Sequence, residues 1–195
     1  MKRVVLLVAM LVCSLSMFAQ SEVAEAPQTD ATYRLPFDNG VVCVAYSLSA
    51  VRLDLARNYN LVDFCAWELI PTEPTSVVAP REGVVESVEG DVVLIRHREN
   101  IYTRLRGATN PVVKVGDEVR KGDTLAPKAE GVVLWLEVFY LTPNPDYGTV
   151  SLGGKGKYLT YYINPIFSTR TKCKVQLTSG NSYTTKARTW CLPWE

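Results

Sequence analysis

The sequence predicts an all-β protein, an antiparallel β-sandwich or barrel. Short runs of β-branched and other apolar residues recur along the chain, and turn-forming glycine and aspartate residues separate them about every eight to twelve residues. In addition, no segment shows the 3.6-residue apolar period of a convincing amphipathic helix. Both observations point to a chain made of short strands and tight turns.

The N-terminal part of this β pattern begins near residue 35. Residues 41–46 are rich in valine and follow the turn-forming sequence Asp-Asn-Gly at 38–40, so we expect a strand there. In residues 47–60, leucine and valine occupy every second position from 51 to 55, which favours a further strand over a helix.

The centre of the chain gives the clearest strand pattern. Apolar runs alternate with turn sequences, among them Glu-Gly-Asp at 89–91, Gly-Asp at 116–117 and Lys-Gly-Asp at 121–123. Each run has the length of a strand in a small β domain. We therefore predict strands at residues 84–88, 92–97, 101–105, 112–115 and 132–140.

The tail, residues 142–195, alternates turn-rich and aromatic segments. Residues 175–177 and 182–185 flank a Ser-Gly-Asn turn and predict a last hairpin. The glycine-rich sequence at 153–156 lacks the Gly-Lys-Ser/Thr ending of a phosphate-binding loop, which favours a hairpin tip instead. The predicted organisation is one domain at 35–168 followed by a C-terminal β extension at 169–195.

The first twenty residues have the pattern of a secretory signal peptide. Lys2 and Arg3 form a positive start, and an apolar run that is too short for a membrane-spanning helix follows them. A lipid anchor on Cys13 is an alternative, although Val12 is a poor fit to the small residue that such a site requires. We expect residues 1–20 to be removed on export, residues 21–34 to form a flexible leader, and the protein to work in the periplasm or outside the cell.

Charge and cysteine content limit the classes of partner. The chain carries 21 Lys and Arg residues against 20 Asp and Glu residues, so net charge gives no argument for a nucleic-acid partner, and no later segment predicts a membrane span. Four cysteines follow the signal peptide, an even number that suggests disulfides in an exported chain. Proximity favours the pairs Cys43–Cys65 and Cys173–Cys191, and buried free thiols are the alternative.

Several segments between residues 62 and 165 resemble, in the same order, the motifs of the LytM-type (lysostaphin-like) zinc peptidases. The segment around Asp63 resembles the one that supplies the metal-binding aspartate. Residues 113–123 are similar to the family sequence VKVGDxVKKGQ, and Asn-Pro at 164–165 is similar to its closing NP. The other matches are 75–85 with TPVYAPxxGVV, 93–97 with VVIRH, 102–105 with YAHL and 134–138 with HLHFEV. The resemblance implies the duplicated-hybrid-motif β fold, a barrel-sandwich hybrid, with an extra C-terminal hairpin region.

The family holds zinc with two histidines and one aspartate, and another histidine assists the activated water. In this chain the aspartate position falls on Asp63, but the histidine positions fall on other residues: the ligands near Tyr59 and on Trp135, the assisting histidine on Val133, and a further active-site histidine on Arg104. His97 is the single histidine of the sequence and matches a non-ligand position. These 195 residues therefore cannot supply a two-histidine zinc site, and we predict a pseudoenzyme without a cofactor. A remodelled metal site built from Asp63, Cys65, His97 and Glu137 is a distant alternative.

Replacement of the ligands predicts an aromatic groove in place of a metal-centred one. The predicted groove residues are Tyr59, Asp63, Arg104, Val133, Trp135 and Glu137. Tryptophan and tyrosine suit protein hot spots and sugar rings, and Arg104 could meet a carboxylate. We expect a regulator or scaffold that docks an envelope protein such as a cell-wall hydrolase, and the alternative is a peptidoglycan-binding module. Trp135 and Val133 could instead fill the old cavity as core residues.

Overall fold

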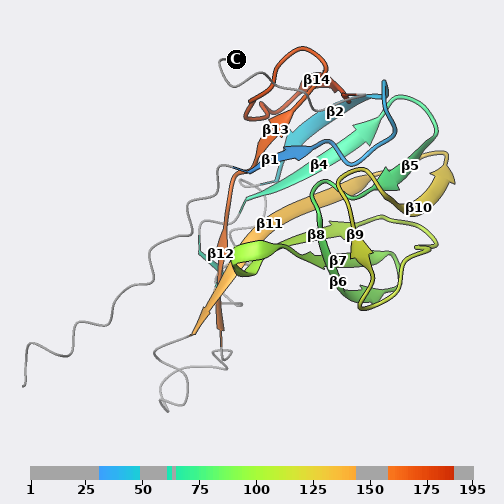
Figure 1. Ribbon diagram of the computed structural model, residues 1–195. Coiled ribbons are helices and arrows are strands. Elements are labelled where there is room, and N and C mark those ends of the chain that lie inside the picture. Colours follow the sequence, from blue (N-terminus) through green and yellow to red (C-terminus); the bar gives the residue numbers. More distant parts are fainter. Residues whose placement is uncertain (1–30, 49–60, 63–64, 144–157, 187–195) are drawn as a thin grey trace, which may run out of the picture.

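A computed structural model describes residues 31–48, 61–62, 65–143 and 158–186, and in these residues it confirms the all-β prediction. The exception is one turn of 3-10 helix at Arg98–Asn100 (Figure 1). The strands are β1 Thr32–Arg34, β2 Val42–Ser47, β3 Leu61–Val62, β4 Ala66–Pro71, β5 Thr75–Val78, β6 Gly83–Glu89, β7 Val92–Arg96, β8 Ile101–Arg106, β9 Glu118–Val119, β10 Thr124–Ala129, β11 Leu134–Pro143, β12 Tyr158–Tyr162, β13 Ile166–Ser168 and β14 Asn181–Thr184.

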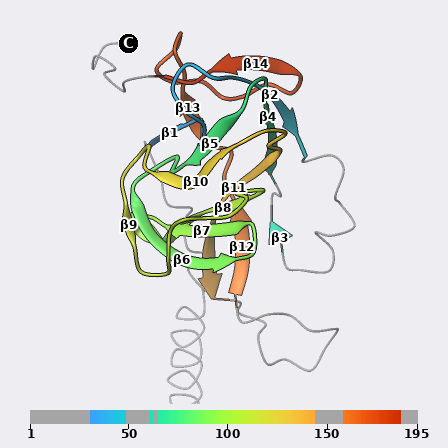
Figure 2. The ribbon, with the colours of Figure 1, turned by 90° about the vertical axis from the view of Figure 1, so that its right-hand side faces the viewer.

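One large sheet carries most of these strands, in the order β14-β2-β4-β11-β8-β7-β6-β9. The strands along this path pair in antiparallel fashion, whereas β12 pairs with β11 on one edge and with the short β3 in parallel on the other. The long strand β11 is the spine, because it pairs with β4, β8 and β12 (Figure 1). Figure 2 shows β14 and β2 at one end of the molecule and β6 and β7 at the other.

Two small strand pairs complete the fold: β5 with β10 in antiparallel fashion, and β1 with β13 in parallel. Their apolar side chains join the inner face of the large sheet in a single core, as expected of a two-layer β protein. From β11 this core receives Leu134, Leu136 and Val138, which are fully buried at every second position of the strand. Other fully buried members of the core are Leu35, Phe37, Cys43, Ala45, Leu69, Val93, Ile95, Ile101, Leu105, Leu125 and Phe167.

The strand predicted at residues 112–115 does not form. Val112 and Val115 are 60% and 65% exposed, and Val112 makes one backbone hydrogen bond, from its N–H to the Leu125 carbonyl. The short strand β9 forms instead, where Val119 is buried and pairs with Gly83 of β6. Val112 and Val115 therefore lie on the surface while Val113 packs against the core, because burial and not β-propensity decides which apolar run pairs.

The predicted last hairpin is also wrong in its pairing. Residues 181–184 form β14, but β14 pairs with β2 and not with 175–177. Val175 makes only an isolated bridge to Phe167. The six-residue β2 offers a longer free edge, and the Gly180 N–H donates to the Ala45 carbonyl to fix the register. The extension thus belongs to the main sheet.

The N-terminal segment departs from the sequence prediction at its end. Residues 32–34, which we placed in the flexible leader, form β1, and Tyr33 is 1% exposed in the core. Residues 49–60, where a further strand was predicted, lie outside the described residues, as does the predicted signal peptide. No helix of the described part of the chain is long and apolar enough to span a bilayer.

Candidate functional site

Four of the six predicted groove residues lie in the described part of the chain, on or beside the outer face of the large sheet. Trp135 and Glu137 lie on β11, Arg104 lies opposite Glu137 on β8, and Val133 directly precedes β11. Residues directly opposite each other on neighbouring strands share a face, so Arg104, Trp135 and Glu137 lie on the face that the core does not use. Tyr59 and Asp63 lie outside the described residues.

Glu137 is the centre of a charged cluster on this face. Its side chain is only 7% exposed, and its two carboxylate oxygens each meet an arginine. Arg104 Nη1 donates to Oε2 at 2.8 Å, and Arg106 Nε lies 3.5 Å from Oε1. Two guanidinium groups thus compensate one nearly buried carboxylate, which would be costly to leave unpaired. Arg104, placed at the groove rim by the sequence, is engaged inside the protein.

Aromatic rings support this cluster from one side. The Arg104 guanidinium carbon lies 4.8 Å from the centroid of the Phe139 ring, a cation–π contact. Tyr102 stacks on Phe139 at 5.7 Å with an interplanar angle of 13°, and Tyr162 packs on it at 5.9 Å. Arg106, Tyr102, Phe139 and Tyr162 were absent from the predicted site. Phe139 could have been placed in the site from the sequence, because it lies two residues after Glu137 on the same strand and therefore on the same face.

The Tyr162 hydroxyl takes part in the same network. Burial raises the pKa of Tyr162 to about 12, and the Glu137 carboxylate acts in the same direction. Arg104 and Arg106, together with a hydrogen bond from the Arg104 side chain, oppose the shift. The hydroxyl is therefore neutral at any physiological pH and serves as a packing and hydrogen-bonding group.

This shift predicts a loss of stability at alkaline pH. The unfolded chain releases the Tyr162 proton from about pH 10, whereas the folded chain keeps it until about pH 12. The unfolded state then binds fewer protons, so stability falls as the pH rises through this window. Urea unfolding at several pH values between 9 and 12 should show a steeper fall for the wild type than for Tyr162→Phe. Equal slopes would contradict the assignment, since every other titrating group is common to both proteins.

A second row of side chains crosses the same face and is open to solvent. Tyr46 of β2, Glu68 of β4, Trp135 of β11 and Arg106 of β8 lie directly opposite one another on successive strands. The Trp135 Nε1–H donates to Glu68 Oε1 at 3.0 Å, which fixes the indole ring, and Trp135 remains half-buried. The Tyr46 ring is 41% exposed. This ladder presents two aromatic side chains and two charges on the outer face of the sheet.

An apolar row lies beside this ladder. Val44 of β2 and Ile70 of β4 lie opposite each other and are half-buried. Val133 is 43% exposed, so it does not fill a cavity in the core. Trp135 likewise lies on the outer face, while its neighbours Leu134 and Leu136 supply the core. The docking face, as we call it below, consists of Val44, Tyr46, Glu68, Ile70, Val133 and Trp135.

His97, the single histidine of the sequence, belongs to the interior and not to this face. It is 3% exposed, and its Nδ1 lies 2.7 Å from the Glu82 carbonyl. A carbonyl only accepts, so Nδ1 carries the proton, and Nε2 then accepts from the Thr103 hydroxyl at 2.7 Å. The Tyr33 ring packs on it edge to face at 5.9 Å. This histidine holds core elements together.

The ligands suggested for a remodelled metal site do not lie together in the described residues. His97 contacts core groups, whereas Glu137 lies on the outer face and is engaged by two arginines. Within residues 31–48, 61–62, 65–143 and 158–186, no three His, Cys, Asp or Glu side chains are grouped as a metal would require. Asp63 lies outside these ranges.

The predicted disulfide between Cys43 and Cys65 is wrong, because both thiols are free. The register between β2 and β4 places Cys43 opposite Pro71, so Cys65 lies six residues further along, about 20 Å away at the rise of a strand. A disulfide needs Cα atoms within about 7 Å. Burial raises the pKa of Cys43 to about 12 and that of Cys65 above its usual value, so both stay protonated. Cys173 is disulfide-bonded, and its predicted partner Cys191 lies outside the described residues.

Comparison with known proteins gives distant structural similarity only. No protein-family model matches the sequence, and no curated protein matches it. Among solved structures, the chain is similar to the deep-sea M23 metalloprotease pseudoalterin, with 12% identity, a TM-score of 0.45, and coverage of 82% of this chain and 98% of that one. It is also similar to a chain of the SpoIIQ–SpoIIIAH pore-forming complex, with 15% identity, a TM-score of 0.41, and coverage of 57% and 85%. Neither similarity assigns an activity or a partner.

Proposed function

We propose that the protein is an exported, non-catalytic LytM-like module that docks a partner protein of the cell envelope, such as a cell-wall hydrolase, through its docking face. The observation that carries the proposal is the ladder in which Glu68 fixes the half-buried Trp135 ring beside the exposed Tyr46. A held tryptophan on an open face loses little conformational freedom on binding, and tryptophan and tyrosine dominate the binding energy of protein interfaces.

The residues that replace the family's histidines support a non-catalytic role. At the position that resembles the YAHL histidine, Arg104 is bound to Glu137. At the positions that resemble the HLHFEV histidines lie Val133, which is exposed, and Trp135, whose ring nitrogen is a donor and not a ligand. The one histidine of the sequence has both ring nitrogens engaged in the interior. Among the described residues, the groups at these positions are engaged in other contacts, and this supports the proposed non-catalytic role.

The make-up of the docking face favours a protein over a glycan. Val44, Ile70 and Val133 add a β-branched apolar strip beside the aromatic residues. A sugar ring stacks on an aromatic face but also needs hydrogen-bonding partners for its hydroxyls, which an aliphatic strip does not provide. An interface core, by contrast, combines apolar side chains with tryptophan and tyrosine. A peptidoglycan ligand is therefore the second candidate.

Trp135→Ala is the variant that tests this proposal. Removal of the indole should weaken binding of the partner by about 30-fold, the effect of losing a 2 kcal/mol hot spot. The partner is first isolated on the immobilised protein from an envelope extract of the source cells, then purified, and its Kd is measured for each variant. Tyr158→Ala is the matched control, because Tyr158 is an exposed aromatic residue, at 46%, on β12 and outside the docking face.

The outcomes separate the two candidate functions. Weaker binding of the purified partner by Trp135→Ala, with Tyr158→Ala unchanged, supports protein docking. Co-sedimentation of the wild type with purified sacculi that Trp135→Ala loses would instead favour the peptidoglycan ligand. Equal affinities for the two variants and the wild type would refute a role for this face. A thermal unfolding curve for each variant checks that the fold is kept.

A further inference from the structure

Arg106 lies beside the docking face, at the end of the ladder that contains Trp135. Its neighbours on the two adjoining strands are Trp135 of β11 and Val92 of β7, and both share its face because they lie directly opposite it. Val92 and Trp135 are half-buried, whereas the Arg106 side chain is 46% exposed. A solvent-accessible guanidinium group is thus set between an aliphatic and an aromatic side chain.

The contact between Arg106 and Glu137 leaves the N–H donors of Arg106 available. Arg106 Nε lies 3.5 Å from Glu137 Oε1, which is longer than a well-formed hydrogen bond. Arg104 donates to the same carboxylate at 2.8 Å. In the described part of the chain, the Arg106 side chain donates no hydrogen bond. Two guanidinium groups also share a single carboxylate, so this part of the face carries one positive charge in excess.

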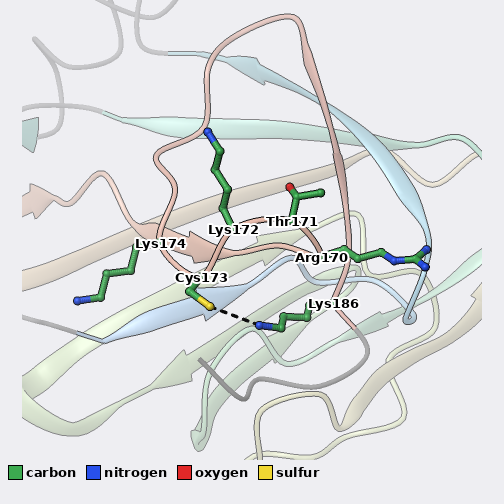
Figure 3. A pocket seen from close by; sticks show the side chains of 6 residues that line it. All are labelled: Arg170, Thr171, Lys172, Cys173, Lys174 and Lys186. Atoms are coloured by element: carbon green, nitrogen blue, oxygen red, sulfur yellow. Dashed lines mark hydrogen bonds between the residues drawn. The ribbon is translucent and has the colours of Figure 1, made fainter. Parts of the chain in front are cut away.

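The cations that line a cavity after β13 have no such common arrangement. This cavity has a volume of about 480 Å³. In Figure 3 the charged ends of Arg170, Lys172 and Lys174 point away from one another, so they do not form one site for an anion. Arg106 differs because a single guanidinium group offers several donors in one plane, and the strand register fixes its neighbours.

Glu68 gives the surface around Trp135 an electrical polarity. The strands β4 and β8 lie on the two sides of β11 (Figure 1), so Glu68 and Arg106 are two strand spacings apart, about 10 Å, with Trp135 between them. Glu68 Oε1 accepts from the Trp135 Nε1–H, which holds this negative charge in place. A carboxylate on a partner is therefore attracted at the Arg106 end and repelled at the Glu68 end.

We propose that Arg106 selects partner surfaces that present an aspartate or glutamate carboxylate next to an apolar side chain. The inference rests on the proposed function, because it places Trp135 in the interface. The carboxylate accepts two parallel hydrogen bonds from the guanidinium fork, and the apolar side chain packs on Trp135 and Val92. These apolar neighbours keep water from the charge pair, which strengthens it. Arg104, to which the sequence analysis gave this role, is bound to Glu137 instead.

The purified partner and three arginine variants test this proposal. Arg106→Gln removes the charge and the fork and should weaken the Kd about tenfold. Arg106→Lys keeps a positive charge beside Glu137 but lacks the fork, and should weaken the Kd about fourfold. Arg120→Gln is the matched control, because Arg120 is an exposed arginine directly after β9, and its Kd should stay within about twofold of the wild type. Thermal unfolding of each variant checks that the fold is kept.

A random peptide display library supplies a probe that does not depend on identification of the partner. Peptides retained by the wild-type protein should carry an aspartate or glutamate next to an apolar residue. Peptides selected on Arg106→Gln should show no such enrichment. A selection on the wild type that enriches no acidic peptides, or enriches the same ones as Arg106→Gln, would overturn the proposal.

The outcomes distinguish this inference from the proposed function. If Trp135→Ala weakens binding of the partner and Arg106→Gln does not, docking stands and recognition of a carboxylate by Arg106 is wrong. If neither variant weakens binding, the docking proposal itself fails. Sedimentation velocity provides the last test: a wild-type dimer that Arg106→Gln dissociates would assign this surface to a second copy of the chain and overturn the proposal.

Discussion

Replacement of Glu137 by alanine is expected to destabilise the protein by about 2–3 kcal/mol. The Glu137 side chain is 7% exposed, and its carboxylate lies 2.8 Å from Arg104 and 3.5 Å from Arg106. Its loss therefore leaves two guanidinium groups without their counter-charge. The two arginines are 28% and 46% exposed and can recover some hydration, which keeps the loss below that of a fully buried pair. In thermal unfolding the midpoint should fall by about 4–12 °C.

The double variant Arg104→Met with Glu137→Leu is the control for this result. Apolar side chains of similar length keep the packing on Phe139 and remove the need to compensate Arg104, so only Arg106, which is 46% exposed, is left without its counter-charge. We expect the double variant to recover at least half of the stability that Glu137→Ala loses. If Glu137→Ala unfolds at the wild-type temperature, the carboxylate does not hold this face together, and Arg104 would be available to a ligand after all.

Gly107→Ala is expected to lower the free energy of unfolding by about 3–4 kcal/mol, more than the matched substitution Gly116→Ala. Gly107 follows β8 with φ +99°, and an added Cβ would lie 2.2 Å from the Val133 carbonyl oxygen and 3.2 Å from its carbon. Both atoms are backbone, at the start of the strand that carries Trp135 and Glu137, so the chain must shift to make room. Left-handed strain contributes about 1–2 kcal/mol and the steric overlap contributes about 2 kcal/mol more.

Gly116→Ala measures the cost of left-handed backbone strain without the steric overlap. Its φ of +92° is close to that of Gly107, but no heavy atom outside the neighbouring residues lies within 4 Å of the added Cβ. Urea unfolding should therefore give a loss of about 1–2 kcal/mol for Gly116→Ala. Equal losses for the two variants would mean that the approach of Gly107 to β11 is looser than the structure describes.

The sequence predicted the part of this molecule that depends on local patterns. The apolar run at residues 132–140 predicted β11, and Trp135 and Glu137 lie on one face of that strand because its period is two. The valines at 112–115 had the same local signal but form no strand, because strand pairing depends on which edge is available elsewhere in the fold. The pairing of β14 with β2 was missed for the same reason.

The docking face depends on register between distant segments, which a single sequence does not contain. Glu68 meets Trp135 across 67 residues of chain. The resemblance to LytM-type motifs identified Arg104, Val133 and Trp135 one at a time. It did not indicate that Arg104 would be bound to Glu137, or that Tyr46 would stand in line with Trp135.

We propose that the docking face binds a partner protein and does not cleave one. The most direct measurement is the release of soluble peptide fragments from purified sacculi by the full chain in the presence of zinc, beside an active LytM-type peptidase that shows the substrate to be cleavable. We expect no release above that of sacculi alone. Release that requires zinc and stops on chelation would contradict it.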